Sequence, residues 1–530
     1  MPATAADTFA PVDRRTLFGV IGASSVGTMI EWYDFYIFGS LASLVATHFF
    51  PQGNTTLALL QTLATFAAGF AARPFGALVF GRVGDVVGRK YAFLVTLVIM
   101  GGATFVIGIL PGYQTIGVFA PLTLLALRLL QGLALGGEYG GAATYVAEHV
   151  PNNRRGFYTA FIQTTATLGL FVSLIVILLV RNAMPKDDWE QWGWRIPFLL
   201  SAVLVIVSLV IRMRLHESPL FVKMKAEGKT STSPVAESLG NSTRWQTMLT
   251  ILWGAAAGQA VVWYTGQFYA LTWLETVGKV DFVATRTIVA VALALATPFF
   301  LVFGALSDRI GRKKVMMAGN LAAAILIIPI FKVMWGFTPA GGTYSPVALT
   351  ACVFSLVLLV TAVYGPIAAF LVECFPARVR YTSVSLPYHV GNGYFGGFLP
   401  VIATAMAAYA ASRPGSFPVD PQFAGLLYPV AIAAITFVVG MFLLRETSKL
   451  DIHNEEHAGV DTRRQPAVLI GLTVLTAVAL LLADQYLLPT FTPAGEPPYV
   501  QYVFRALVVI VIAAALVPRM LRGRGTPARS

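Results

Sequence analysis

The sequence predicts an all-α polytopic membrane protein, made of two parallel six-helix bundles with two extra transmembrane helices at the C-terminus. Three observations predict this fold class. Of the 530 residues, 56% are apolar and only 12% are charged, whereas soluble proteins have roughly 25% charged residues. Apolar stretches long enough to cross ~30 Å of hydrocarbon as a helix recur along the whole chain. Finally, motifs of the first half reappear in the second half.

The apolar stretches are expected to be helices, because backbone polar groups in lipid must be satisfied within the segment. Runs such as "LFVSLIVILLV" lack the apolar–polar alternation of membrane β-strands. We expect twelve spans, near residues 17–46, 57–80, 91–111, 116–146, 157–180, 194–213, 246–274, 284–305, 315–335, 346–372, 384–411 and 424–444. Two further spans are expected near 466–483 and 500–518.

The spans and the polar intervals between them give the expected domain organisation. The predicted segments are an N-terminal tail 1–16, a six-helix bundle 17–213, a central loop 214–245, a second six-helix bundle 246–445, a linker 446–465 and a two-helix extension with a basic tail 466–530.

The net charge of +12 is a topology signal rather than a sign of nucleic-acid binding. Most Lys and Arg residues lie in the two tails and the even-numbered loops, so the positive-inside rule places these loops and both termini in the cytoplasm. Cys352 and Cys374 are the only cysteines, and their spacing makes no metal site. "VDRRTLFGVIGAS" resembles an export signal, but its long apolar run and the spans behind it favour a retained first helix.

An internal repeat divides the chain into two equivalent halves. "GRVGDVVGRK" begins at Gly81 and "GALSDRIGRKK" at Gly304, a displacement of 223 residues, and each copy follows the second span of its half. "EHVPNNRR" matches "ECFPARVR" after the fourth span, and "RLHES" matches "LLRETS" after the sixth. With an even number of helices, the halves are parallel repeats, and substrates of such transporters lie near the midplane between them.

The repeated loop motif resembles the signature of the major facilitator superfamily over roughly residues 15–450. The patterns "EWYDFYIFG", "RPFGALVFGRVGDVVGRK", "RLLQGLALGGEYGGA" and "WRIPF…HESPLF" resemble its metabolite:proton symporter family. The resemblance implies a twelve-helix fold and transport of osmolytes or organic acids together with protons. Two departures stand out: Val86 replaces the usual basic residue of the first loop motif, and the last two spans lie outside the twelve-helix core.

The repeated loop residues are candidates for a latch at the cytoplasmic face. Acids and bases stand at matching places in both halves, although basic loop residues could equally serve topology alone. Within the first half we expect Glu148, Arg155 and Glu217 to gather around Arg89, and the equivalent residues to gather around Arg312. As exposed pairs each would contribute only about 0–1 kcal/mol. The predicted gating residues are Asp85, Arg89, Glu148, Arg155, Glu217, Asp308, Arg312, Glu373, Arg380 and Glu446.

Charged residues inside the spans are candidates for proton coupling, because each costs roughly 2.5–3.5 kcal/mol to insert and needs a partner or a function. Asp34 lies ~25 Å along the first helix and Arg128 ~30 Å from the cytoplasmic end of the fourth, so the two could meet at similar depth. An Asp facing an Arg switches between a paired ionised form and a protonated form, although a static ion pair is the alternative. In transporters that this chain resembles, an acid on helix one and an Arg on helix four couple protons.

The other intramembrane charges have two interpretations each. Glu31 is a second titrating group or is simply hydrogen-bonded to Ser or Tyr hydroxyls. Glu138, in the glycine-rich "LGGEYGG", supports the Arg or is structural. Arg73 precedes Pro74 and is interpreted as fixing a helix kink, although it could attract an anion. Asp34, Arg128, Glu31 and Glu138 are therefore the proton-coupling candidates.

Helix seven, "GQAVVWYTGQFYALTW", carries amides and aromatic rings along most of its length, which exceeds an interfacial belt. We expect these groups to line a substrate site that binds an anion if Arg128 dominates, or a quaternary ammonium if the rings dominate. His389 could titrate there or be only hydrogen-bonded. The predicted substrate-binding residues are Tyr33, Tyr36, Gln131, Gln163, Gln259, Trp263, Tyr264, Gln267, Tyr388 and Asn392.

The sequence thus predicts a monomeric proton-coupled importer of a small polar metabolite in the inner (plasma) membrane, with the proton as coupling ion and no cofactor or metal. A facilitator or exchanger without proton coupling, or a transporter-like sensor, is the alternative. An enzyme is disfavoured, because the sequence shows neither metal-ligand spacing nor a nucleophile motif. A channel is disfavoured by the lack of a filter pattern.

Overall fold

The computed structural model describes residues 14–452, apart from residues 52, 87–88, 214–236, 238–241, 377–378 and 414. Every element in this part of the chain is helical. The predicted C-terminal helices at 466–483 and 500–518, and most of the predicted central loop, lie outside the described residues.

Twelve helical passages coincide with the twelve predicted spans of the two bundles. The first six are α1 (Arg14–Ser40) with α2 (Ala42–Phe49), α3 (Thr55–Val86), α4 (Arg89–Ile109), α6 (Phe119–Gly136) with α7 (Tyr139–His149), α8 (Arg155–Asn182), and α10 (Ile196–Leu199) with α11 (Ser201–Met213). Short helices α5 (Tyr113–Ile116) and α9 (Lys186–Gln191) and 3-10 turns η1 (Asn152–Arg154) and η2 (Gly193–Arg195) connect them.

The second six passages repeat the plan with more interruptions. They are α14 (Ser242–Ile251) through η3 (Leu252–Ala256), α15 (Ala257–Tyr264) and η4 (Thr265–Tyr269) to α16 (Ala270–Thr276); α17 (Phe282–Ala296) with α18 (Pro298–Ile310); α19 (Arg312–Trp335); α20 (Pro346–Tyr364) with α21 (Ile367–Glu373); α22 (Arg380–Val390) through η6 (Gly391–Gly396) to α23 (Leu399–Ser412); and α25 (Leu427–Leu443), preceded by α24 (Pro421–Ala424).

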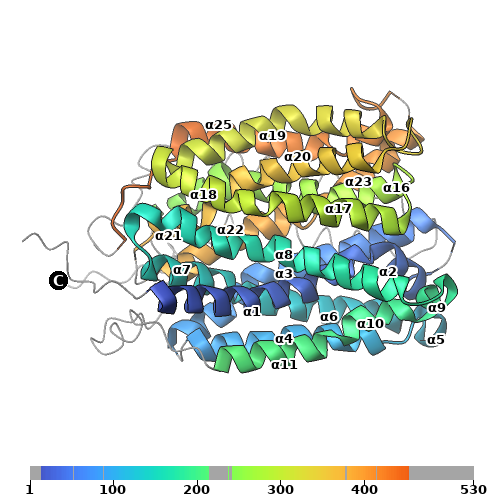
Figure 1. Cartoon of the computed structure of the whole chain (residues 1–530), viewed down its shortest axis with the longest axis horizontal. Helices are drawn as coiled ribbons and strands as arrows, with labels where there is room; N and C mark the ends of the chain where they lie inside the picture. The colour runs from blue at the N-terminus through green and yellow to red at the C-terminus, as the bar shows by residue number, and fades with distance from the viewer. Residues whose placement is uncertain are drawn as a thin grey trace, which may run out of the picture.

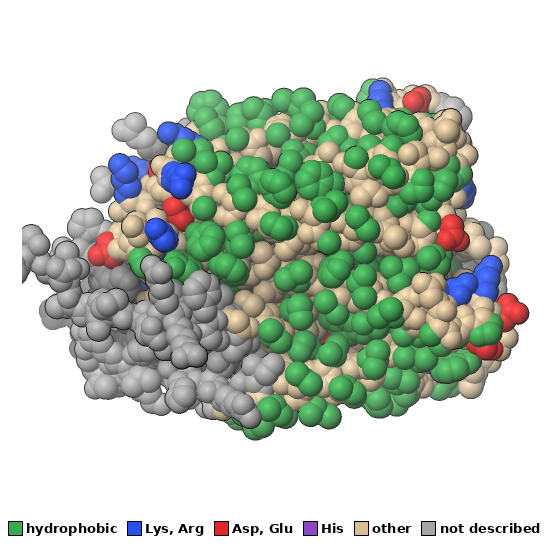
Figure 2. Space-filling view, in the orientation of Figure 1, with side chains coloured by type: hydrophobic (Ala, Val, Ile, Leu, Met, Phe, Trp, Pro, Cys, Tyr) green, Lys and Arg blue, Asp and Glu red, His purple; other side chains and the backbone are tan. Residues whose placement is uncertain are grey.

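Nine of these passages are long and apolar enough, within the described residues, to cross a membrane. The other three predicted spans, 17–46, 91–111 and 246–274, are also helical. Hydrophobic side chains cover the band between the two ends of the molecule, and charged side chains gather at the ends (Figure 2). This surface is that of a multi-pass membrane protein.

The two halves pack in the same way internally and lie side by side, with their helices running roughly parallel (Figure 1). In the first half α3 packs against α6 and α4 against α11; their equivalents in the second half, α17 with α20 and α19 with α25, are also in contact. Contacts between the halves run mainly from α8 to α17 and α18, and from α3 to α22 and η6. Charged groups at the interface therefore include residues of α8, α18 and α22.

Helices α3 and α6 approach closely through glycines, which fixes the depth of two buried arginines. A methyl group added at Gly132 would collide with the carbonyl oxygen of Gly69, and one added at Gly136 would collide with that of Arg73. This is the small-residue packing typical of membrane helices. Arg73 and Arg128 are thereby held on adjoining helices in the first half.

Three wide π-helical turns interrupt helices seven and eleven. Turns η3 and η4 flank α15, and η6 follows α22 directly. Such turns occur mostly at functional positions, because they displace the helix and re-aim its side chains. Here they lie next to Trp263, Tyr264 and Asn392, which the sequence singled out for substrate binding.

Candidate functional site

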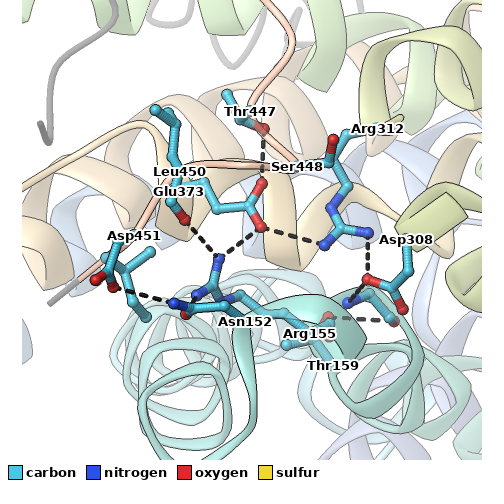
Figure 3. A network of polar contacts seen from close by, with 12 residues as sticks. Asn152, Arg155, Thr159, Asp308, Arg312, Glu373, Thr447, Ser448, Leu450 and Asp451 are labelled. Atoms are coloured by element: carbon cyan, nitrogen blue, oxygen red, sulfur yellow. Dashed lines mark hydrogen bonds and ion pairs between the residues drawn. The ribbon is translucent and has the colours of Figure 1, made fainter. Parts of the chain in front are cut away.

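A buried network of ion pairs joins the halves at one end of the bundle, which we call the basic end (Figure 3). Glu373 of α21 is its centre and is only 1% exposed. Its Oε1 accepts hydrogen bonds from Arg155 Nη1 at 2.8 Å and Arg312 Nη2 at 3.2 Å. Its Oε2 accepts from Thr447 Oγ1 at 2.6 Å. One carboxylate is thus shared by arginines from both halves.

Arg312 is anchored within its own half as well. Its Nη1 donates to Asp308 Oδ1 at 2.6 Å and to Ser307 Oγ at 2.8 Å, and its backbone N–H donates to Glu446 Oε1 at 2.8 Å. The loop motif of the second half therefore folds on itself and presents the guanidinium to Glu373.

Asp308 also caps the first turn of α8 in the other half. Its carboxylate accepts hydrogen bonds from the backbone N–H groups of Gly156 at 2.8 Å and Phe157 at 2.9 Å. These N–H groups lack partners inside the helix, and the positive end of the helix dipole favours the negative charge. Gly156 is required here, because a methyl group at this position would collide with the Arg312 guanidinium.

A second ion pair crosses the halves in the opposite sense. Arg380 Nη1 donates to Glu148 Oε1 at 3.0 Å, and both side chains are buried. The same guanidinium donates from Nη2 to the carbonyl of Ile452 at 2.8 Å and from Nε to that of Phe375 at 3.0 Å. Arg380 thereby ties the end of the second half to α7.

These contacts add bonds between the halves to the latch that the sequence predicted, and they correct its expected exposure. Arg155 and Glu148 bond to Glu373 and Arg380 across the halves, because α7 and α8 abut α21 and α22 rather than only their own loop. The pairs are also buried rather than exposed, so losing one partner costs more than the surface estimate. The side chains of Asp85 and Arg89, and all of Glu217, lie outside the described residues.

Asp34 lies deep in the first bundle, fully buried. Neither carboxylate oxygen has a hydrogen-bond partner among the described residues. The side chain faces α4 at Gly101, where an added methyl group would lie 3.3 Å from Oδ2. The predicted ion pair with Arg128 is not formed in this conformation.

Arg128 instead bonds to neutral groups through Nη1, and its Nε and Nη2 have no hydrogen-bond partner among the described residues. Its Nη1 donates to Gln131 Oε1 at 2.6 Å and to the carbonyl of Phe35 at 3.3 Å. Gln131 Nε2 in turn donates to Thr104 Oγ1 at 2.7 Å. Three aromatic rings cover the guanidinium, with centroids 4.0 to 5.1 Å from its central carbon: Phe35, Phe38 and Phe66.

The two glutamates of the first bundle are also buried. Glu138 Oε1 accepts a hydrogen bond from Thr28 Oγ1 at 3.0 Å, which links helix four to helix one. Glu31 is 1% exposed and lies one helical turn before Asp34 on the same helix. Both are therefore enclosed within the first half.

An aromatic cluster connects the halves at the centre of the molecule. Tyr36 stacks on Trp32 of its own helix with centroids 4.8 Å apart and on Trp263 of the other half at 5.3 Å. Tyr139 stacks on Tyr388 of the other half, with the ring centroids 3.5 Å apart and the planes nearly parallel. We call these five rings, together with Tyr264, the central cluster.

Amides and hydroxyls surround the central cluster. Gln163 Nε2 donates to Tyr139 Oη at 2.7 Å, and the hydroxyls of Tyr364 and Tyr388 lie 2.6 Å apart. Asn392 Nδ2 donates to Gln259 Oε1 at 3.1 Å. The structure therefore brings two of the predicted amides together and places a third against the ring stack.

Two predicted substrate residues lie elsewhere or bridge the halves differently. The Tyr33 hydroxyl donates to the carbonyl of Pro197 at 2.7 Å, so this ring packs between spans one and six. Gln267 Nε2 donates to Thr167 Oγ1 of α8 at 3.3 Å, which joins helix seven to helix five.

Arg73 lies against the central cluster, although the sequence was interpreted as giving it a structural role. It is fully buried, with its guanidinium carbon 5.0 Å from the ring centroid of Trp32 and 5.4 Å from that of Phe70. The signal was available, since an arginine inside a membrane span is costly. The neighbouring Pro74 favoured a structural interpretation instead.

A second set of contacts joins the halves at the opposite end, which we call the far end. Arg286 of α17 donates from Nη2 to the carbonyl of Ser40 at 2.6 Å and from Nη1 to Glu275 Oε2 at 3.0 Å. Ser43 Oγ donates to Glu275 Oε1 at 2.7 Å. No sequence motif indicated these residues, because the repeated motifs lie in the loops at the basic end. The halves thus touch at both ends in this structure.

No cluster of three or more metal-ligating side chains occurs within the described residues. Together, the contacts between the halves at the two ends, the enclosed charges of the first bundle and the polar aromatic centre make an arrangement suited to passage of a small solute between two bundles.

Comparison with known proteins agrees with this arrangement. The family model described as "Sugar (and other) transporter" matches residues 20–243 and again 222–456. The chain is 37% identical over 445 residues to the inner membrane metabolite transport protein YhjE of Escherichia coli (strain K12), covering 83% of this chain and 96% of the relative. It is 36% identical over 434 residues to the alpha-ketoglutarate permease of the same organism, covering 82% and 95%.

A candidate proline/betaine transporter of Staphylococcus aureus (strain MSSA476) is 31% identical over 441 residues, covering 82% of this chain and 90% of the relative. Among solved structures, the D-xylose-proton symporter matches with a TM-score of 0.61 at 16% identity, covering 82% of this chain and 98% of that one. This likeness confirms the predicted twelve-helix fold.

The family contains transporters rather than enzymes, and the relatives named are metabolite carriers. With its family model matched over most of its length and relatives above 30% identity along the same stretch, the chain belongs to the Sugar (and other) transporter family of the major facilitator superfamily.

Proposed function

We propose that the chain imports a small polar metabolite, an organic acid or a betaine-like osmolyte, together with protons by alternating access. The relatives named for α-ketoglutarate and for proline or betaine support this substrate range. We also propose that the basic end faces the cytoplasm, as the positive-inside rule predicts.

The observation that carries proton coupling is the isolated Asp34 carboxyl group. It is fully buried, and neither oxygen has a hydrogen-bond partner in the described part of the chain. A carboxyl group in such a place costs less to bury with its proton than without it. Arg128, meanwhile, is held by Gln131 and by the Phe35 carbonyl, as expected when Asp34 does not claim it.

In the proposed cycle, loss of the proton leaves a buried charge that requires a partner. Arg128 of α6 bonds to the carbonyl of Phe35, the residue next to Asp34, so it is a basic group beside this part of helix one. Pairing of Asp34 with Arg128 would release Gln131 and the Phe35 carbonyl, and helix one would shift against α6. Because helix one also carries Tyr36 and Ser40, which contact the second half, this shift would reach the interface between the halves.

Uptake into proteoliposomes tests the proposal. The panel consists of labelled α-ketoglutarate, proline, glycine betaine and choline, with and without an inward proton gradient. We expect the gradient to drive accumulation of at least one compound in the wild type, and Asp34→Asn to abolish accumulation while keeping exchange. Asp187→Asn, an exposed acid at the far end, is the matched control and should behave as the wild type.

Accumulation that ignores the gradient would identify a facilitator or exchanger instead. Accumulation that survives intact in Asp34→Asn would remove this residue from the coupling mechanism and leave the transport proposal standing.

A further inference from the structure

Arg73 is a buried cation that has no counter-charge among the described residues. The side chain is 0% exposed, and no carboxylate of the described residues forms an ion pair with it. The Tyr388 hydroxyl lies near the Arg73 guanidinium. None of the three guanidinium nitrogens makes a hydrogen bond of normal geometry, however. A buried charge left in this state is costly, so a group that completes it would bind favourably.

The surroundings of Arg73 come from both halves of the transporter. Its guanidinium faces the rings of Trp32 and Phe70. It is also close enough to interact electrostatically with four phenols that span the interface: Tyr36, Tyr139, Tyr264 and Tyr388. A ligand at Arg73 would therefore touch both bundles at the centre of the molecule, where parallel-repeat transporters hold their substrates.

The other buried arginine of the first bundle does not offer the same site. Arg128 already donates to Gln131 and to the Phe35 carbonyl, and three phenylalanine rings cover it. Its surroundings suit an internal switch. Around Arg73 lie aromatic faces, phenol hydroxyls and the buried imidazole of His389, which interacts with it electrostatically. These surroundings suit a ligand.

The positive charge of Arg73 decides which chemical group of a solute can lie against it. A cluster of aromatic rings alone would attract a quaternary ammonium group. Here the cluster already contains a guanidinium, which repels a simple cation and favours an acceptor. Arginine binds carboxylates through two parallel hydrogen bonds, and phenol hydroxyls can donate to the same oxygens.

We propose that Arg73 anchors a carboxylate group of the transported solute, so that the cargo is a small molecule carrying a carboxylate, bound against the central cluster. The inference rests on the proposed transport function and names the residue that binds the carboxylate shared by organic acids and betaines. A simple cation such as choline is excluded, whereas a betaine qualifies through its carboxylate.

Ligand binding to purified protein in detergent tests the inference without a proton gradient. The probes are α-ketoglutarate, proline and glycine betaine, with the diamide of α-ketoglutarate and choline as counterparts that lack a carboxylate. We expect at least one carboxylate to raise the melting temperature, and both counterparts to leave it unchanged. Arg73→Gln should weaken that binding about 10–100-fold, as removal of a charged hydrogen-bonding partner does.

Two further variants keep the test independent of folding. Arg73→Lys retains the charge but cannot form two parallel hydrogen bonds to a carboxylate, so it should bind the carboxylate probe several-fold more weakly than the wild type. Arg413→Gln removes an exposed arginine at the far end, whose Nη1 bonds only to Tyr409 in the described structure, and should bind normally.

The inference is overturned by stabilisation from choline or the diamide equal to that from the carboxylates, by wild-type affinity in Arg73→Gln, or by no response to any carboxylate probe. Because the assay uses no gradient, failure of proton coupling in proteoliposomes would leave its result unaffected. The two proposals can therefore fail separately.

Discussion

At the scale of single residues, burial decides how much each gate pair contributes. Arg155 and Glu373 are both 0% exposed, and Glu373 also holds Arg312. Replacing one partner strands a buried charge, so we expect Glu373→Gln to cost about 3–5 kcal/mol and Arg155→Gln somewhat less. We expect the losses of stability in the two single variants to add up to much more than the loss in the double variant, because the second substitution removes a charge that the first has left without its partner. Melting temperatures of the three variants measure these losses.

The exposed pair Lys186–Glu190 is the matched comparison. Its atoms are 3.5 Å apart, but the side chains are 70% and 50% exposed. A double-mutant cycle on these two residues should give a coupling energy below ~0.5 kcal/mol. Equal non-additivity in the two cycles would contradict the argument from burial.

At the scale of elements, the glycine contacts between α3 and α6 set the positions of Arg73 and Arg128. An added side chain at Gly132 would meet the backbone of Gly69, which cannot move aside without shifting α3. We expect Gly132→Ala to destabilise the protein by about 1–3 kcal/mol or more and to reduce uptake strongly. Melting temperature in detergent and uptake of the substrate found in the panel measure the two effects.

Gly102 in the neighbouring helix α4 provides the control. Nothing lies within 4 Å of a methyl group added there. Gly102→Ala should therefore be neutral, or stabilising by up to about 1 kcal/mol through helix propensity. A similar loss of stability and uptake in both variants would show that close packing of Gly132 against α3 does not cause the effect of Gly132→Ala.

The helices and the repeat could be predicted from the sequence because both depend on local composition and spacing. The gate residues could be found in the same way, since the loop motif names them. Their partners could not be found, because the pairing of Arg155 with Glu373 and of Arg380 with Glu148 depends on how α7 and α8 meet α21 and α22. The same limit applies to Arg73: the sequence showed a buried cation, but not its surroundings, which come from helices distant in the sequence.

The isolated Asp34 shows a second limit. Sequence spacing placed Asp34 and Arg128 at similar depth. Whether the two side chains pair with each other or bond to neutral groups depends on protonation state and conformation. In this structure Arg128 bonds to Gln131 and to a backbone carbonyl, and Asp34 faces Gly101. Depth along a helix can be counted from the sequence, whereas the direction of a side chain cannot.

At the scale of the whole molecule, the two halves are joined at the basic end and at the far end in the same structure. Alternating access requires each set of contacts to break in turn. Arg286 at the far end bonds to Ser40 and Glu275, and Arg155 at the basic end bonds to Glu373. Because each set stabilises closure of its own end, removing one should shift the population toward opening at that end alone.

Distances between spin labels measure this shift. Labels at the exposed Thr47 and Thr287 report on the far end, and labels at Asn153 and Arg309 report on the basic end. In a cysteine-free background, Arg286→Gln should lengthen the first distance and keep the second short, whereas Arg155→Gln should do the reverse. If either variant lengthened both distances together, the halves would be separating as a whole. The two sets of contacts would then hold the bundles together rather than act as alternating gates.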